Sequence, residues 1–248
     1  MMAKKILCLL VLTIILNFSN VLALELQIVS DPFAPLGYES RDGEIVGLTV
    51  DVIRALLEET EIKGKFLMLP WARAYHMAKT EENILIYSLV KTEERQKIFK
   101  LVGPFLHERA YLYKLKKRKD IRLDSLDDIW KYRVGVVNEY YAHQYLVSEG
   151  FEELLDIAVT PELNLKKFIV GRFDLLVFGE VFFNYQIKEK GYNPDLFEKV
   201  LYVMLNEIYL AFSQKTDDEI VKRFEQALKR IKLNGTIDKI TRKYLEIK

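Results

Sequence analysis

The chain contains a single cysteine, Cys8, among its 248 residues, and only three histidines. One thiol cannot form an intrachain disulfide or a cysteine-based zinc site, because both need further cysteines. The histidines His76, His107 and His143 have no partner at a metal-binding spacing such as H-E-x-x-H. The 11 glycines are scattered and form no phosphate-binding loop, and there is no G-x-S-x-G nucleophile turn. We therefore expect no metal and no cofactor.

An excess of charge of either sign is also missing. The 37 basic and 36 acidic residues nearly cancel, which gives no electrostatic reason to expect nucleic acid as a partner. Half of the residues are hydrophobic, enough for the core of one large or two small domains. After residue 23, no run is long and apolar enough to span a bilayer.

The first apolar run has the features of a secretory signal peptide over residues 1–23. Lys4 and Lys5 precede the uncharged segment 6–15, and Val21-Leu22-Ala23 offers small or apolar residues at the cleavage position. Polar residues interrupt the run too early for a membrane anchor, which needs about 20 apolar residues. We predict cleavage near Ala23 and export of the rest of the chain.

The exported part reads as two successive α/β units. In the first unit, strands at 26–30, 65–69 and 84–88 alternate with helices that begin at Gly47 and at Trp71. The order βαβαβ predicts a parallel sheet with helices on its faces. A strand at 110–115 then leads to the charge cluster Lys116–Asp120, which we interpret as a crossover between lobes.

The pattern restarts after this cluster. We predict strands at 133–137, 157–159 and 173–178, and helices at 140–149, 163–170 and 181–190. Strands at 201–205 and 208–213 can lead the chain back to the first unit. Two helices close the chain, the first at 217–233 and the second reaching Leu245.

Arg95 occupies the most informative position in the first unit. Thr92 is a plausible helix N-cap, and Glu93 and Glu94 favour the positive end of the helix dipole. Arg95 then lies in the first turn, just past the carboxyl end of the strand that ends at Ser88, where ligands of α/β proteins bind. A guanidinium offers paired donors that match a carboxylate. The alternative is a surface arginine that pairs with a nearby glutamate.

Several short motifs share an order and spacing with one family. They are Pro32-Phe33 with Asp42-Gly43 and Gly47, Thr92–Arg95 leading to Gly103-Pro104-Phe105, Arg133–Val136, Gly171–Asp174, and Asn234-Gly235-Thr236 before Lys243-Tyr244. In these features the chain resembles the periplasmic solute-binding proteins of polar amino-acid ABC importers, extracellular solute-binding protein family 3. The resemblance covers essentially the whole exported chain.

The resemblance implies a type II periplasmic-binding-protein fold, an α/β fold with two lobes, two crossovers and a ligand cleft that closes by a hinge motion. Residues 24–111 with 206–248 would form lobe 1, and residues 112–205 would form lobe 2. It also implies that Arg95 binds the ligand's α-carboxylate and that Ser88 helps to bind its α-amino group. The positions of Phe33 and Trp71 fit the aromatic wall of the pocket.

The chain departs from the family pattern at three places. Val90 stands where a hydroxyl residue is usual, and Asn138-Glu139-Tyr140-Tyr141 replaces a Gly-Thr turn whose amides help to hold the carboxylate. The acid that usually holds the amino group aligns with Gly179, and Glu180 follows it. If Glu180 replaces that acid, the amine site survives in altered form. Otherwise the protein is no ordinary amino-acid binder.

The candidate residues place opposite charges on the two lobes. Arg95 of lobe 1, with Arg73 as a second candidate, suits the anionic end of a ligand, while Glu139 of lobe 2, with Glu180 as a second candidate, suits its cationic end. Five aromatic residues could present a ring face to a cation or to an apolar group of the ligand. The alternative for each is ordinary packing in the core. These residues are Tyr87, Trp71, Tyr140, Tyr141 and Phe178.

The sequence thus predicts a periplasmic receptor that captures a small amino-acid-like or zwitterionic solute. Its expected partners are that small molecule and an ABC permease in the inner membrane, and we expect a monomer. The alternative is a periplasmic lyase on the same fold, similar to cyclohexadienyl dehydratase, with Glu180 or Glu139 as the acid. The sensor module of a larger receptor would require a membrane-spanning segment after the lobes, which we do not expect here.

Overall fold

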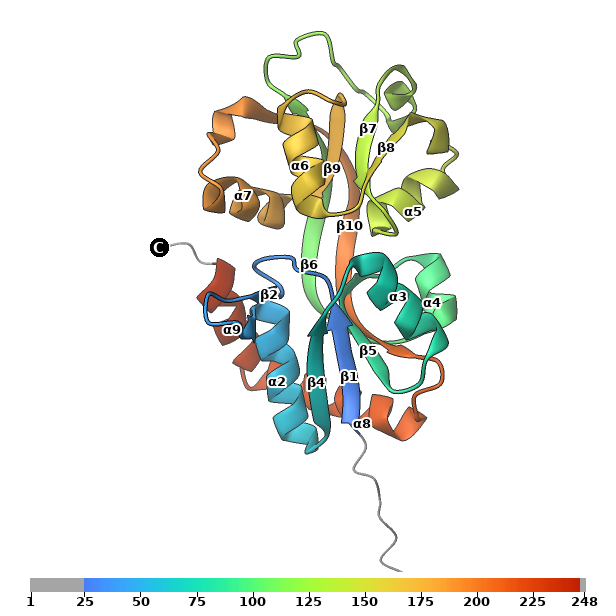
Figure 1. Cartoon of the computed structure of the whole chain (residues 1–248), viewed down its shortest axis with the longest axis vertical. Helices are drawn as coiled ribbons and strands as arrows, with labels where there is room; N and C mark the ends of the chain where they lie inside the picture. Colours follow the sequence, from blue (N-terminus) through green and yellow to red (C-terminus); the bar gives the residue numbers. More distant parts are fainter. Residues whose placement is uncertain (1–24, 246–248) are drawn as a thin grey trace, which may run out of the picture.

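The computed structural model describes residues 25–245, and the predicted signal peptide lies outside them. The elements form two lobes that lie end to end along the long axis, and two long strands run through both (Figure 1). These are β6 (Phe99–Leu115) and β10 (Phe197–Ser213). The two-lobe α/β architecture predicted from the sequence is confirmed.

One eight-stranded sheet extends through both lobes in the order β4-β1-β5-β10-β6-β9-β7-β8. In lobe 1, β1 lies parallel to β4 and β5, and in lobe 2, β7 lies parallel to β8 and β9. The strands other than β6 and β10 are β1 (Glu25–Ser30), β4 (Lys63–Met68), β5 (Ile84–Val90), β7 (Val134–Val137), β8 (Leu155–Ala158) and β9 (Leu175–Gly179). A separate small hairpin pairs β2 (Tyr38–Glu39) with β3 (Ile45–Val46).

Helices flank the sheet in each lobe, as a βαβ order requires. Lobe 1 contains α2 (Leu48–Thr60), α3 (Trp71–Thr80), α4 (Glu93–Ile98), α8 (Asp218–Leu233) and α9 (Thr236–Leu245). Lobe 2 contains α5 (Tyr141–Ser148), α6 (Pro161–Ile169) and α7 (Glu180–Glu189), with short 3-10 turns η1 (Leu126–Lys131), η2 (Glu152–Leu154) and η3 (Pro194–Leu196). None of the helices described is long and apolar enough to cross a membrane.

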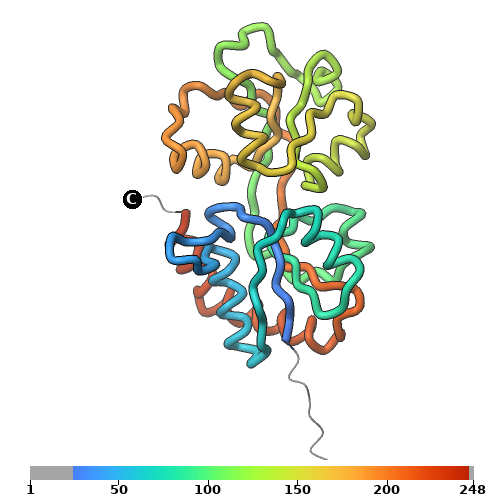
Figure 2. The backbone as a smooth tube through the Cα atoms, viewed as in Figure 1, coloured from blue at the N-terminus to red at the C-terminus, as the bar shows by residue number. Residues whose placement is uncertain are grey.

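The two long strands are the main difference from the sequence prediction. We expected a strand that begins at Ala110 in place of β6, and two strands at 201–205 and 208–213 in place of β10. Instead, β6 and β10 pair antiparallel from Phe99 with Ser213 to Leu115 with Phe197, and bulges absorb the irregular positions. The backbone trace shows both strands passing side by side between the lobes (Figure 2).

The charge cluster Lys116–Asp120 is therefore not the crossover, and that interpretation is wrong. The strand β6 already pairs with β9 of lobe 2 at Ala110, so the chain has crossed before it reaches the cluster. The cluster forms a turn at the distal end of lobe 2, where the Lys116 amide donates to the Leu196 carbonyl. The lobe boundaries predicted near residues 111 and 205 fall within these two strands and stay a proposal.

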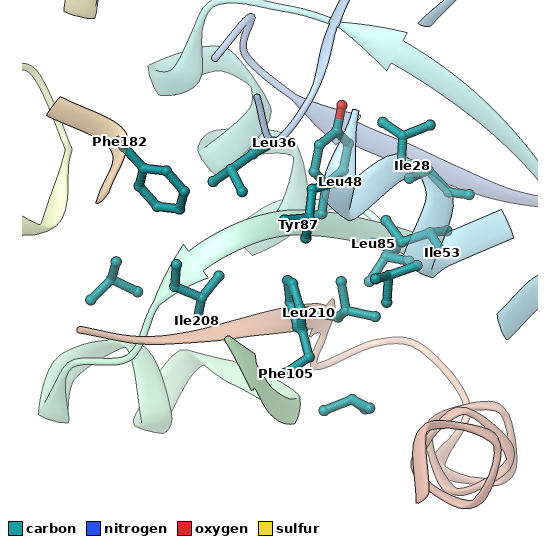
Figure 3. Close-up of a cluster of buried hydrophobic side chains, with 14 of the residues drawn as sticks. Ile28, Leu36, Leu48, Ile53, Leu85, Tyr87, Phe105, Phe182, Ile208 and Leu210 are labelled. Atoms are coloured by element: carbon teal, nitrogen blue, oxygen red, sulfur yellow. The ribbon is translucent and has the colours of Figure 1, made fainter. Parts of the chain in front are cut away.

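Buried aliphatic and aromatic side chains from the sheet and its helices form one core that extends from lobe 1 into lobe 2, and Figure 3 shows part of it. This core reaches the junction between the lobes, where Leu36, Ile208 and Phe182 of α7 belong to the same cluster. The lobes therefore share apolar contacts as well as strands.

Gly135 illustrates how tightly lobe 2 is packed. A methyl group on this residue of β7 would lie 1.9 Å from the ring of Phe173, which is buried and stacked on Phe168. We expect Gly135→Ala to reduce the free energy of unfolding by about 1 to 3 kcal/mol, the usual cost of overpacking a core. Urea denaturation followed by circular dichroism measures this change. The exposed variant Val170→Ala should stay within about 0.5 kcal/mol of the parent protein, and an equal effect of both changes would contradict the packing described.

Candidate functional site

A cavity of about 80 Å³ lies between the lobes and next to the two long strands. A buried water needs about 10 to 15 Å³ on this measure, so the cavity has room for roughly six waters or one compact solute. Lobe 1 lines it with Asp31, Phe33, Leu36, Trp71, Ser88, Val90 and Arg95. Lobe 2 contributes Val136, Val137, Tyr140, Tyr141, Ala142, Pro161, Asn164, Val177, Phe178, Gly179 and Phe182, and the long strands contribute Glu108, Asn206 and Ile208.

Arg95 reaches the cavity because Thr92 caps helix α4 as predicted. The Thr92 hydroxyl accepts a hydrogen bond from the Arg95 amide at 3.2 Å, which places Arg95 in the first turn after β5. Its side chain is among the largest fully buried ones, with 1% exposure. The alternative that Arg95 is a surface charge is therefore wrong.

The guanidinium of Arg95 has only neutral partners. Its Nε donates to Gln144 Oε1 at 2.9 Å, one Nη donates to the Val90 carbonyl at 2.8 Å, and the other donates to the Glu139 carbonyl at 2.9 Å. Within residues 25–245, no carboxylate oxygen lies within 4.0 Å of it. Since a guanidinium has five N–H donors, two remain for another acceptor. A buried cation without an anion is costly, so the site favours an anionic group.

Two aromatic rings complete the surroundings of this cation. The carbon of the guanidinium lies 5.7 Å from the ring centre of Trp71 and 5.5 Å from that of Tyr75. Such contacts stabilise a desolvated cation. Burial lowers the pKa of Arg95, and the nearby Tyr75, Glu139 and Glu94 oppose this shift. An arginine remains charged under these conditions.

Several contacts cross the cleft and hold the lobes together around the cavity. The Glu139 carbonyl of lobe 2 accepts hydrogen bonds from Arg95 and, at 2.9 Å, from Trp71 Nε1. Glu139 has a φ of 60°, a backbone conformation that turns the chain sharply after β7. On the other side of the cleft, Gln186 donates to the Ala34 carbonyl at 2.6 Å.

Asp31 is a buried carboxylate of the cavity that the sequence analysis missed. It directly follows β1, so it lies at the carboxyl end of a parallel strand, which was the signal available. Tyr140 of lobe 2 donates its hydroxyl hydrogen bond to Asp31. Burial raises the pKa of Asp31 to about 6, although this hydrogen bond opposes the shift.

Glu108 is a second missed carboxylate and comes from the long strand β6. It is 4% exposed, and its Oε1 accepts from the Phe182 amide at 2.8 Å. Burial raises the pKa of Glu108 to about 8, while hydrogen bonds from the Phe182 and Val181 amides oppose the shift. No Lys, Arg or His nitrogen in the described part of the chain lies within 4.0 Å of its carboxylate.

Two buried asparagines add unsatisfied acceptors to the same cavity. Asn164 of α6 is 2% exposed and Asn206 of β10 is 1% exposed. The side-chain oxygen of each has no hydrogen-bond partner among residues 25–245. Buried polar atoms are normally paired, so these oxygens need a donor.

The structure brings most of the predicted site residues together. Arg95, Ser88, Phe33, Trp71 and Tyr140 line the cavity, as do Tyr141 and Phe178. Ser88 has a φ of 59° and donates to the Thr49 hydroxyl at 3.0 Å. Glu139 does not line the cavity, but its carbonyl anchors Arg95 and its carboxylate accepts from Gln144 at 3.0 Å.

The remaining predicted residues lie elsewhere. Tyr87 is buried in lobe 1 with its hydroxyl toward Met68, and Arg73 is exposed on α3. Glu180 forms a 2.5 Å ion pair with Lys199 in a separate surface depression. Its side chain therefore does not reach the cavity next to Gly179. Within the described residues, no cluster of three His, Cys, Asp or Glu side chains could hold a metal.

Comparison with known proteins agrees with this geometry. The profile of the bacterial extracellular solute-binding proteins, family 3, matches residues 26–247. The probable amino-acid-binding protein YxeM of Bacillus subtilis (strain 168) is 24% identical over 219 residues, which cover 85% of this chain and 79% of YxeM.

Two solved structures share the fold. A histidine kinase sensor domain with similarity to periplasmic binding proteins superposes with a TM-score of 0.81 and 20% identity, over 89% of this chain and 96% of that one. An ancestral arginine-binding protein bound to arginine gives a TM-score of 0.77 and 19% identity, over 89% and 98%. The match over nearly all of residues 25–245 shows that the chain belongs to the bacterial extracellular solute-binding proteins, family 3.

Proposed function

We propose that the protein captures a small amino-acid-like, zwitterionic solute in the cavity between its lobes. The buried guanidinium of Arg95 is the observation on which this proposal rests. Its two unused donors and its lack of a carboxylate partner among residues 25–245 suit the carboxylate of a solute. The relative YxeM carries the name of a probable amino-acid-binding protein, which supports the same ligand class.

The same cavity also offers groups that suit a cation. Asp31 and Glu108 are both buried, and both line the cavity together with Arg95. Phe33, Phe178 and Phe182 add apolar walls to it. Phe33 lies 6.0 Å from Phe178 and 5.7 Å from Phe182, measured between ring centres across the cleft. A site with few polar groups in an apolar enclosure is typical of small-molecule receptors.

The biological setting follows from the family. We infer export to the periplasm with cleavage of a signal peptide near Ala23, and delivery of the solute to an ABC permease in the inner membrane. The same proposal makes the protein a monomeric receptor rather than an enzyme. Solute binding would strengthen the contacts across the cleft, and the permease would recognise the closed arrangement of the lobes.

Removal of the Arg95 guanidinium tests the proposed carboxylate site. We expect Arg95→Ala to weaken amino-acid binding by roughly 2 to 5 kcal/mol, because the carboxylate of the solute would be buried without a partner. Titration calorimetry measures this with the amino acid that binds the parent protein most tightly, after unfolding and refolding to remove solute carried through purification.

Arg73→Ala is the matched control, since Arg73 is exposed on the neighbouring helix α3. It should leave the affinity unchanged. Circular dichroism must show that the Arg95 variant is folded, because Gln144, Val90 and Glu139 lose a donor. Unchanged affinity in a folded Arg95→Ala protein would rule out the proposed role of the guanidinium.

A lyase on the same fold makes a different prediction. The acid would have to touch the substrate, yet Glu180 pairs with Lys199 and the Glu139 side chain does not line the cavity. We expect no change in absorbance when the protein is incubated with cyclic carboxylic acids that can lose water. Turnover of such a compound, abolished by Arg95→Ala, would replace the receptor proposal by the enzymatic one.

A further inference from the structure

We propose that Glu108, on the strand that joins the lobes, is the carboxylate that binds the cationic group of the solute. This inference rests on the proposed function and specifies its cationic half. It assigns the role to neither of the sequence candidates, because the Glu139 side chain does not line the cavity and Glu180 pairs with Lys199.

Glu108 fills the space that a side chain at residue 179 would occupy. The strands β6 and β9 pair Ala110 with Gly179, which brings Glu108 alongside the end of β9. A Cβ atom added to Gly179 would lie 1.7 Å from Glu108 Oε2 and 2.1 Å from its carboxyl carbon. An acid on residue 179 and the present Glu108 carboxylate are therefore mutually exclusive, and one takes the place of the other.

Helix α7 holds this carboxylate in position. Gly179 is the N-cap of α7 and provides no side-chain cap, so the amides of the first turn need an outside acceptor. The carboxylate of Glu108 accepts from the Phe182 and Val181 amides, which fixes its orientation. The structural alternative is that Glu108 is only a helix cap, and the experiment below separates the two roles.

Glu108 lies among both acceptors and donors: two asparagine side-chain oxygens of the cavity are unpaired acceptors within the described residues, whereas the neutral hydroxyls of Tyr113 and Tyr141 lie nearby. Asn206 is the direct cross-strand partner of Glu108 on β10, and its side-chain oxygen is unpaired within the described residues. The side-chain oxygen of Asn164 in the same cavity is also unpaired there. An ammonium group offers three donors to these acceptors and neutralises the carboxylate. Asp31 is the competing carboxylate of the cavity and accepts from the Tyr140 hydroxyl, whereas Glu108 has an unpaired acceptor, the Asn206 side-chain oxygen, on the residue directly across from it.

The pH dependence of binding gives an independent readout. Three titratable residues surround Glu108: Glu180 of α7, Tyr113 of β6 and Tyr141 of α5. Both tyrosines stay neutral, because burial raises their pKa values. Since burial raises the pKa of Glu108 to about 8, an ammonium must displace its proton at lower pH. The affinity should increase by up to about tenfold per pH unit until the pH reaches that pKa, and then level off.

The test compares each proteinogenic L-amino acid with its 2-hydroxy acid analogue, which keeps the carboxylate and replaces the ammonium by a hydroxyl. Thermal shift first selects the amino acid that stabilises the parent protein most, and calorimetry then gives its Kd and that of the analogue. We expect Glu108→Gln to weaken amino-acid binding roughly 10- to 100-fold, the range for a lost hydrogen bond to a charged group. Binding of the hydroxy acid should change little, and the pH dependence should flatten.

Folding of this variant is checked without ligand. A glutamine oxygen can still accept from the Phe182 amide, so the cap remains. The charged form of Glu108 is disfavoured in the folded protein, because its pKa rises from 4.5 to about 8 on folding. The protonated Glu108 carboxyl therefore contributes to the free energy of unfolding at low pH, and this contribution is lost as the pH rises through 8. Glu108→Gln should raise Tm above that of the parent protein at about pH 8.5, with little difference at about pH 5.

A pair of double variants distinguishes binding from capping. Gly179 has φ −71° and ψ 136°, which any residue can adopt. Glu108→Ala with Gly179→Asp moves the carboxylate to residue 179, and Glu108→Ala with Gly179→Asn restores a cap without a charge. We expect the aspartate variant to regain amino-acid affinity and the asparagine variant to remain weak.

Three results would overturn the inference. They are equal rescue by Gly179→Asn, an unchanged preference for the amino acid over the hydroxy acid in Glu108→Gln, or a loss of that preference in Asp31→Asn alone. If no amino acid stabilises the parent protein, the proposed function itself fails. The outcomes for Glu108 and for the receptor function are thus distinguishable.

Discussion

The burial of one positive charge constrains the arrangement of the whole site. Arg95 sits 1% exposed between the lobes, where desolvation of a cation is costly. The protein offsets this cost with two ring faces and three neutral acceptors, two of which belong to lobe 2. The guanidinium therefore links the lobes and at the same time keeps donors for an anion. Removing the charge would relieve the desolvation cost, but it would also remove the contact that joins the Glu139 turn to lobe 1.

The lobes could be predicted because their signals are local. Helical spacing in α2 and α8, and short apolar strands bounded by turn residues, identify α/β units without knowledge of their neighbours. The full length of β6 and β10 could not be predicted from such local signals. Gly103-Pro104 interrupts β6 with residues typical of a turn, and only pairing with β10, nearly 100 residues later in the chain, keeps the strand continuous. The misplaced crossover at Lys116–Asp120 follows from this non-local effect.

Arg95 could be predicted from nearby residues, whereas Glu108 depends on contacts between distant parts of the chain. Arg95 follows from a cap, a short helix and the end of a strand, all within a few residues, so sequence reasoning found it. Glu108 depends on the pairing of β6 with β9 and on the missing side chain of Gly179. Glu180 has the expected chemistry next to the expected position, but as the first residue of α7 it projects toward Lys199 instead. Adjacent residues of a helix point in directions about 100° apart, so a carboxylate cannot simply move by one position.

The location of Glu108 on a strand that connects the lobes links the geometry of the cavity to the relative position of the lobes. Arg95 belongs to lobe 1, whereas Glu108 is bonded to the first turn of α7 in lobe 2. A rigid solute that paired with both would fix the distance between a helix of one lobe and a helix of the other. A hinge motion between the lobes would change the geometry of β6 and β10, because these strands join them, and would move Glu108 and Asn206 relative to Arg95. If Arg95 and Glu108 bind the two charged groups as proposed, closure and recognition would depend on the same residues, because a solute with both charges at the right spacing would stabilise the closed lobes.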